Sequence, residues 1–209
     1  MSRTKLEGSA RDRLLAAANE LFYEEGVHTV GIDRVIERAG VAKASLYSTF
    51  GSKEELVLAY LGSRSAARQR RVSERIARHE SARDKIVAIF ELMGEIVAEP
   101  QFRGCAFANA SAEGPRDAKV SGVCTDHRAW LRRLLIELAR EAGALDPELL
   151  GRQLQLLYDG AIVAAATDRD AGGARVALAA VQALLALNLP TTGKNSRPKR
   201  ASKAAERRV

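Results

Sequence analysis

Cysteine is scarce in this sequence, and its two cysteines, Cys105 and Cys124, stand in neither a metal-ligand spacing nor a CxxC motif. The three histidines, at positions 28, 79 and 127, are scattered, so we expect no metal site. Aromatic residues make up only 5% of the 209 residues, whereas alanine and leucine are abundant, which favours helices over strands. These scarcities predict a helical chain that folds without a disulfide or a metal ion.

Long apolar runs are also missing. No stretch approaches the roughly 20 apolar residues of a membrane span, and the N-terminal segment does not resemble a signal peptide, so we expect a cytoplasmic protein. No nucleophile–base arrangement, phosphate-binding loop or paired-carboxylate motif can be assigned a catalytic role. We therefore do not expect an enzyme or a bound cofactor.

The formal net charge of +7 is distributed unevenly along the chain. Residues 191–209 hold seven Lys/Arg and one acidic residue, a net charge of +6, which leaves +1 for the first 190 residues. Residues 1–60 hold eight basic and nine acidic residues, a net charge of −1. We expect the basic tail to be disordered and to contact DNA without sequence preference. DNA binding by the N-terminal region must depend on where its charges lie.

Apolar residues recur at helical spacing almost throughout, and no stretch alternates as a half-buried strand does. The pattern predicts eight or nine helices and no sheet. Their expected ranges are 10–25, 32–39, 41–50, 52 to the late seventies, 81–97, 105–112, 116–141, 147–168 and 173–188.

Residues 31–50 have the pattern of a helix-turn-helix. Two short helices joined by a turn at Gly40 must cross steeply to bury their apolar residues together, as in DNA-binding motifs. Those apolar residues are Ile32, Val35, Ile36, Val41 and Leu46. The second helix presents small or hydrogen-bonding side chains outward: Lys43, Ala44, Ser45, Tyr47, Ser48 and Thr49. An ordinary pair of antiparallel helices is the alternative, and the exposed Tyr47 and Lys53 favour DNA binding.

Residues 10–60 resemble the N-terminal domain of the TetR family of bacterial repressors. The similar positions are Gly26 through Ile32, Ala39-Gly40-Val41-Ala42-Lys43, Leu46-Tyr47, Phe50 and Ser52-Lys53-Glu54-Glu55-Leu56. The resemblance implies an all-α fold with a three-helix DNA-binding domain over 1–55, a helical effector-binding and dimerisation domain over 56–190, and the tail 191–209. It also implies a repressor that binds a palindromic operator as a homodimer and is released by a small molecule.

The resemblance implies a role for each matching position. Lys43, Ala44 and Ser45 stand where the family meets base edges and nearby phosphates, and Tyr47 and Lys53 stand at its phosphate-contacting positions. Gly31 and Ile32 open the helix whose N-terminal amides can meet a phosphate. Ser48 and Thr49 complete the expected DNA-binding residues. Thr49 departs from the family, in which many members have histidine, and threonine is shorter and never cationic.

The broken stretch around residues 104–114 lies between two long predicted helices, where imperfect packing can leave a cavity. The large side chains best spaced to line it are Phe90, Met93, Phe107, His127, Trp130 and Tyr158. This mainly apolar set suits a hydrophobic or aromatic effector. The alternative for each of these residues, His127 included, is that it fills the core.

Two further patterns leave alternatives open. Five arginines share one face of the fourth helix, either as a solvated face or as an anion-attracting surface: Arg64, Arg68, Arg71, Arg75 and Arg78. The two cysteines act either as small buried hydrophobes or as a thiol sensor.

Small and branched residues on the last two helices predict a four-helix dimer interface: Leu157, Ala161, Ala164, Ala165, Ala180, Leu184 and Leu187. An architectural DNA-binding protein and an all-helical enzyme are the competing functions.

Overall fold

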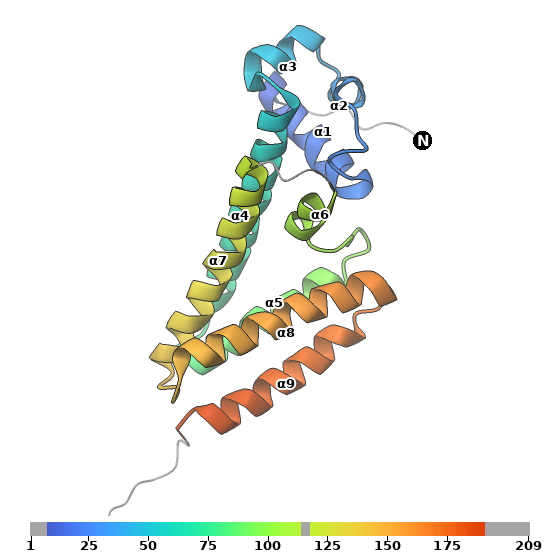
Figure 1. Ribbon diagram of the computed structural model, residues 1–209. Coiled ribbons are helices and arrows are strands. Elements are labelled where there is room, and N and C mark those ends of the chain that lie inside the picture. Colours follow the sequence, from blue (N-terminus) through green and yellow to red (C-terminus); the bar gives the residue numbers. More distant parts are fainter. Residues whose placement is uncertain (1–7, 114–117, 191–209) are drawn as a thin grey trace, which may run out of the picture.

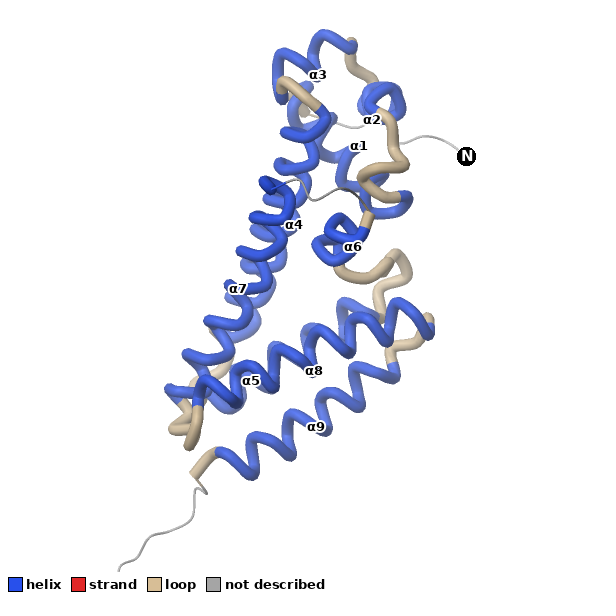
Figure 2. Tube along the Cα trace, viewed as in Figure 1, coloured by secondary structure: helices blue, strands red, loops and turns tan. Residues whose placement is uncertain are grey.

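The computed structural model describes residues 8–113 and 118–190. Within these ranges the chain forms nine α-helices and no strand (Figures 1 and 2), which confirms the all-α prediction. The helices are α1 (Ala10–Glu25), α2 (Ile32–Ala39), α3 (Lys43–Phe50), α4 (Lys53–Ile76), α5 (Ala82–Val97), α6 (Ala106–Ala112), α7 (Ala118–Glu141), α8 (Pro147–Asp168) and α9 (Gly172–Asn188). Most of these ends lie within two residues of the positions expected from the sequence.

Local capping explains where several helices begin. The hydroxyl oxygens of Ser9, Ser52 and Ser81 accept hydrogen bonds from the backbone N–H three residues later, at distances of 3.0–3.2 Å. The Asp146 carboxylate accepts a 3.0 Å bond from the Leu149 N–H in the same way, at the start of α8. Each bond satisfies a donor that the helix itself leaves unpaired, so these starts are specified by short sequence segments.

Two hydrophobic cores occupy the two ends of the described structure. The first joins α1, α2 and α3 to the beginning of α4, and Leu14, Leu46 and Leu56 are fully buried in it. The second joins α5, α7, α8 and α9. The expected domain boundary after residue 55 falls in the first turn of α4, whose residues as far as Leu61 pack in the first core. The long α4 therefore belongs to both ends of the protein.

The helices divide the molecule into an N-terminal head and a C-terminal body. Figure 1 shows α1, α2 and α3 at one end and α5, α8 and α9 at the other, with α4 and α7 running between them. The short α6 lies between the head and the body, packed against α7 and α4. This arrangement connects the head, which holds the predicted helix-turn-helix, to the body through α4.

The buried face of α7 is not the same along the whole helix. Leu131, Leu135 and Leu138 are buried, whereas Trp130 and Leu134 are only partly buried. The helix changes neighbours along its length: Cys124 packs in the first core, and the later leucines pack in the second. The buried face of α7 therefore changes along the length of the helix.

None of the helices within 8–113 and 118–190 has the length and apolar character that a bilayer span requires. The expected disordered basic tail, residues 191–209, lies outside the described residues.

Candidate nucleic-acid interface and adjoining cavity

The turn between α2 and α3 is held by a glycine and by a contact from α1. Gly40 adopts the left-handed conformation (φ 63°, ψ 43°), in which a side chain is unfavourable. Its N–H donates to the Ile36 carbonyl at 3.0 Å, and its own carbonyl accepts a 3.1 Å bond from Nη1 of Arg13. Behind the turn, Val35 and Leu46 are fully buried. Ile32, Ile36 and Val41 pack against them while partly exposed, so the two helices share a small core as expected.

The outer face of α3 exposes Lys43, Ala44 and Ser48, together with Tyr47, which is 47% exposed. Thr49 is partly buried, and its hydroxyl donates a 2.6 Å bond to the Ser45 carbonyl one turn earlier. That bond engages the Thr49 hydroxyl within the helix. The face therefore presents one cation, one aromatic ring and small polar groups to the solvent.

Two helix N-termini lie at this end of the protein without a side-chain cap. Gly31 precedes α2 and Ala42 precedes α3, and neither residue caps the first-turn amides with a side-chain hydrogen bond. Gly31 is exposed, and no neighbouring atom lies within 4 Å of the position that a Cβ would take. Backbone amides of this kind, at the positive end of a helix dipole, suit an anion such as a phosphate.

Several cations of the head already have carboxylate partners. The Lys43 Nζ lies 3.0 Å from Oδ1 of Asp33, and this hydrogen bond raises the pKa of Lys43. Arg34 is paired with Glu25 (Nη2–Oε1 2.8 Å). Exposed pairs contribute little to stability, so Lys43 can exchange Asp33 for a phosphate at small cost.

A cavity of about 920 Å³ lies next to the head and is lined by residues of α1, α4, α5, α6, α7 and α8 and of the segment before α6. Three of the expected residues line it: Phe107, His127 and Tyr158. The expectation that Phe90 and Met93 also line it is wrong, because the inward face of α5 buries both completely in the second core. Trp130 is not a lining residue either. It lies beside His127, with 5.8 Å between the ring centroids.

His127 is held between α4 and α6. Its ring stacks on Phe107 with 3.7 Å between the centroids, and its Nδ1 lies 3.0 Å from the Ser65 hydroxyl oxygen. Burial, assisted by the positive charge of Arg68, lowers the pKa of His127 to about 4. The imidazole is therefore neutral at pH 7 and adds no charge to the cavity.

The sequence left two interpretations of the arginine face of α4 open, a solvated face or an anion-attracting surface. Arg64, Arg68 and Arg71 line the cavity, whereas Arg75 pairs with Glu95 and Arg78 is exposed beyond the end of the helix. The spacing showed only that the five share one face. The helices that cover part of this face determine which of them meet the cavity.

The two cysteines are free thiols in different surroundings. Cys124 is buried, its Sγ lies 3.4 Å from the Phe107 carbonyl oxygen, and burial raises the pKa of its thiol. Cys105 is partly buried and lines the cavity. A raised thiol pKa disfavours the reactive thiolate at Cys124, which supports the small-hydrophobe interpretation for that residue.

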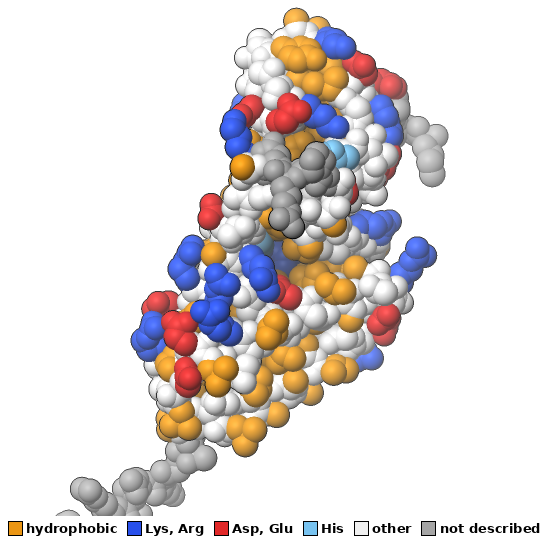
Figure 3. All heavy atoms as spheres, viewed as in Figure 1, with side chains coloured by type: hydrophobic (Ala, Val, Ile, Leu, Met, Phe, Trp, Pro, Cys, Tyr) orange, Lys and Arg blue, Asp and Glu red, His pale blue; other side chains and the backbone are white. Residues whose placement is uncertain are grey.

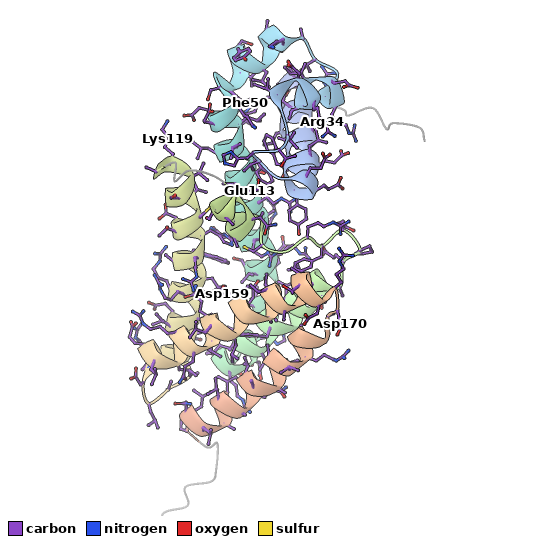
Figure 4. The ribbon with its side chains drawn as sticks, turned by 45° about the vertical axis from the view of Figure 1, so that its right-hand side comes forward. Arg34, Phe50, Glu113, Lys119, Asp159 and Asp170 are labelled. Carbon is purple, nitrogen blue, oxygen red and sulfur yellow. The ribbon has the colours of Figure 1, made fainter. Side chains whose placement is uncertain are left out.

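The head contacts the walls of the cavity directly. The Tyr23 hydroxyl donates to the Gly104 carbonyl at 3.0 Å and accepts from the Arg103 N–H at 2.9 Å, and Tyr23 itself lines the cavity. Glu113, which follows α6, accepts a 3.2 Å bond from the His28 N–H (Figure 4). Any movement of α6 or of the segment before it therefore acts on α1 and on the loop before α2.

Comparison with known proteins agrees with this architecture. The sequence model described as "Bacterial regulatory proteins, tetR family" matches residues 14–60. The crystal structure of SCO4454, a TetR-family transcriptional regulator from Streptomyces coelicolor, is 35% identical. It superposes with a TM-score of 0.81 over 86% of this chain and 95% of that one.

Two curated relatives match over shorter segments. The transcriptional activator FasR of Mycolicibacterium smegmatis is 51% identical over 51 residues, 24% of this chain and 23% of FasR. The transcriptional repressor NemR of Escherichia coli is 30% identical over 109 residues, 51% of this chain and 55% of NemR. The aligned segments thus span less than two thirds of either relative. The crystal structure of reduced NemR superposes with a TM-score of 0.73 at 26% identity, over 84% of this chain and 97% of that one.

The named relatives are transcriptional regulators rather than enzymes. Similarity at 35% identity extends across nearly the whole of one such regulator and includes both the helix-turn-helix and the helical body. On these grounds the chain is a DNA-binding transcriptional regulator of the TetR family.

Proposed function

We propose that this regulator is a repressor that binds a palindromic operator as a homodimer and leaves it when a small molecule enters the cavity. The observation that supports this most directly is the physical connection between the helix-turn-helix and the cavity. Tyr23 belongs to α1 of the head, lines the cavity and is hydrogen-bonded to the segment before α6.

The DNA contacts that we propose follow from the family resemblance, and the exposure of Lys43, Ala44, Tyr47 and Ser48 supports them. Lys43, Ala44 and Ser45 begin α3 and meet base edges in the major groove, with Ser48 and Thr49 beside them. The amides at Gly31 and Ile32, with Tyr47 and Lys53, meet phosphates on either side. Phosphate contacts position the helix, whereas the contacts from α3 distinguish sequences.

The dimer interface that we propose lies on the outward face of α8 and α9. Leu156 and Val163, one heptad apart on α8, are 66% and 60% exposed, and Val176 and Leu187 of α9 are exposed as well. Figure 3 shows apolar side chains gathered over this part of the molecule. Ala161 and Ala165, expected in the interface, are instead buried against the chain's own core. An exposed apolar face of this kind favours association with a second copy, and a two-fold dimer favours a palindrome.

Release requires only that the ligand bind one arrangement of the heads better than another. A ligand in the cavity touches α4, α6 and α7 together, and the Tyr23 and Glu113 contacts link α6 and its approach to the head. Repression is favoured over activation because the match to the repressor NemR spans 109 residues, more than a DNA-binding domain of about 55 residues, whereas the match to the activator FasR spans 51 residues.

Selection from random duplexes, followed by footprinting of the selected sites, tests this proposal. We expect a short protected sequence with two-fold symmetry, and compounds that raise the melting temperature should lower operator affinity. Equal affinity for every duplex would support an architectural DNA-binding protein instead. Compounds that stabilise the protein but leave operator affinity unchanged would contradict release.

A further inference from the structure

The charges around the cavity do not cancel. Four arginines line it (Arg64, Arg68, Arg71 and Arg128), against two carboxylates, Glu99 and Asp159. Both carboxylates are already paired: Glu99 with Arg71 at 2.9 Å and Asp159 with Arg128 at 2.7 Å, and Figure 4 shows Asp159 on α8. The described lining therefore has two positive charges in excess, on Arg64 and Arg68.

The two unmatched arginines differ in their surroundings. The Arg64 guanidinium stacks over the Tyr23 ring at 3.8 Å and donates a 3.1 Å bond to the Asn19 carbonyl. A ring face and a carbonyl thus accommodate part of its charge. Arg68 has a single side-chain hydrogen bond among the described residues, from Nη1 to the Tyr158 hydroxyl oxygen at 2.7 Å, and no carboxylate within ion-pair distance. Arg64 Nε is buried without a hydrogen-bond partner, but Arg68 has neither a ring face nor a carbonyl against its charge among the described residues, so it is the cation with the least compensation.

The Arg68–Tyr158 pair has hydrogen-bond donors that are not used within the described part of the chain. Arginine has five N–H donors, and Arg68 uses one of them here. The Tyr158 oxygen accepts that bond, so its own proton is left for another acceptor, and burial raises the pKa of Tyr158 and keeps that proton in place. A carboxylate accepts hydrogen bonds from N–H and O–H groups of this kind, so the half-buried Arg68 guanidinium and the buried Tyr158 hydroxyl together suit a carboxylate ligand.

The remainder of the cavity wall is suited to an apolar group. Phe107, stacked with the neutral His127, lines the cavity beside Leu131 and Ile162. The cavity thus combines an apolar wall with one site of unmatched positive charge, and its volume of about 920 Å³ is that of a site for a small organic molecule.

We propose that the cavity binds an amphipathic organic anion, whose carboxylate pairs with Arg68 and Tyr158 while its apolar body lies against Phe107 and Leu131. This inference rests on the proposed effector function and specifies the class of effector. It also adds an anionic group to the hydrophobic or aromatic effector that the sequence predicts. A neutral ligand would leave the Arg68 charge uncompensated and would displace the water that solvates it, which costs free energy.

Matched pairs of compounds test the charge requirement. We choose 2-naphthoate with 2-naphthamide, and decanoate with decanamide, because each pair has the same body and differs at the charged end. Isothermal titration calorimetry with the full chain should show the acid binding about tenfold to hundredfold more tightly than the amide, since the charge-assisted bonds are lost with the amide. Equal affinities, or no binding of either acid at millimolar concentration, would overturn the proposal.

Substitutions test whether Arg68 and Tyr158 cause the preference for the acid over the amide. Arg68→Gln should bring acid and amide to similar affinity, and Tyr158→Phe should weaken the acid about tenfold because one hydrogen bond to the charged carboxylate is lost. Arg68→Lys retains the charge but not the planar fork, so it should retain part of the preference. Arg70→Gln is the matched control, because it removes the same charge from an exposed position on the same helix, outside the lining.

Two results separate this inference from the proposed function. A preference for the acid that survives in Arg68→Gln would overturn the inference. If Arg68→Gln fails to fold, judged by its circular dichroism spectrum, then an undiminished acid preference in Arg68→Lys and Tyr158→Phe would overturn it. Operator affinity is measured separately by fluorescence anisotropy with the same compounds. Binding of the acid through Arg68 without loss of operator affinity would contradict release and leave the inference standing.

Discussion

Lys53 and Lys43 are two lysines of the DNA-binding face with different expected roles. Lys53 begins α4 at a position that the family resemblance assigns to a phosphate contact, and it is partly buried rather than exposed as expected. Lys53→Ala should therefore weaken binding to all duplexes by a similar factor. The slope of log affinity against log salt should also fall by about 1. Lys43→Ala should change the order of preference among operator variants, because Lys43 begins α3.

Anisotropy titrations on an operator and a scrambled duplex, at several salt concentrations, check both variants. Lys85→Ala serves as the control, since Lys85 is paired with Glu141 in the body, away from the head. Unchanged affinity and unchanged salt slope in Lys53→Ala would mean that the assigned docking face is wrong.

His127 should make stability depend on pH in a defined direction. Its pKa is about 4 in the folded protein and about 6.5 in an unfolded chain, so the unfolded state binds the proton more readily. The stability associated with neutral His127 is fully present above pH 6.5 and declines as pH falls toward 4. Urea unfolding between pH 4 and 7.5 should show a steeper loss for the wild type than for His127→Gln. The difference should be below about 1.4 kcal/mol per pH unit, because the ring is partly solvated. Identical slopes would show that His127 is protonated equally in both states.

At the scale of helices, Gly151 marks a close approach of α8 to α7. A Cβ at this position would lie 2.4 Å from Cγ1 of Ile136 and 2.9 Å from its backbone N and Cα. Because backbone cannot move aside easily, Gly151→Ala should lower the free energy of unfolding by about 1–3 kcal/mol. Gly62→Ala, in the middle of α4 with open space around it, should raise it by about 0.5–1 kcal/mol through helix propensity. Urea titrations measure both, and a stabilising Gly151→Ala would contradict the close crossing.

The outward face of α8 and α9 should control association. Leu156→Glu places a charge in the proposed interface, so light scattering at micromolar concentration should give the monomer mass, and affinity for a palindrome should fall toward that for a half-site. Leu145→Glu, at an exposed leucine in the loop before α8, should remain dimeric. A wild type that is itself monomeric would refute the proposed interface.

At the scale of the whole molecule, the basic tail should add affinity without specificity. Residues 191–209 have a net charge of +6, and the first 190 residues together have +1. Deleting residues 191–209 should lower the slope of log affinity against log salt by up to about 5 and leave the preferred operator unchanged. An unchanged slope would show that the tail makes no contact with DNA.

The helices and the DNA-binding motif could be predicted from the sequence, because their causes are local. Ser9 and Ser81 cap helices with bonds that span three residues, and Gly40 permits a left-handed turn. The small and polar residues of α3 were also identifiable, since helical spacing alone places Lys43 and Tyr47 on one outward face.

What each helix face meets could not be predicted in this way, because it depends on packing between segments that are distant in the sequence. Arg68 and Arg78 share one stripe in the sequence, yet one lines a cavity and the other is exposed, because other helices cover only part of α4. Met93 and Tyr158 were expected together, but α5 buries Met93 in the core while α8 places Tyr158 at the cavity wall. Periodicity specifies which residues share a face. Packing between distant segments determines whether that face meets core, cavity or solvent.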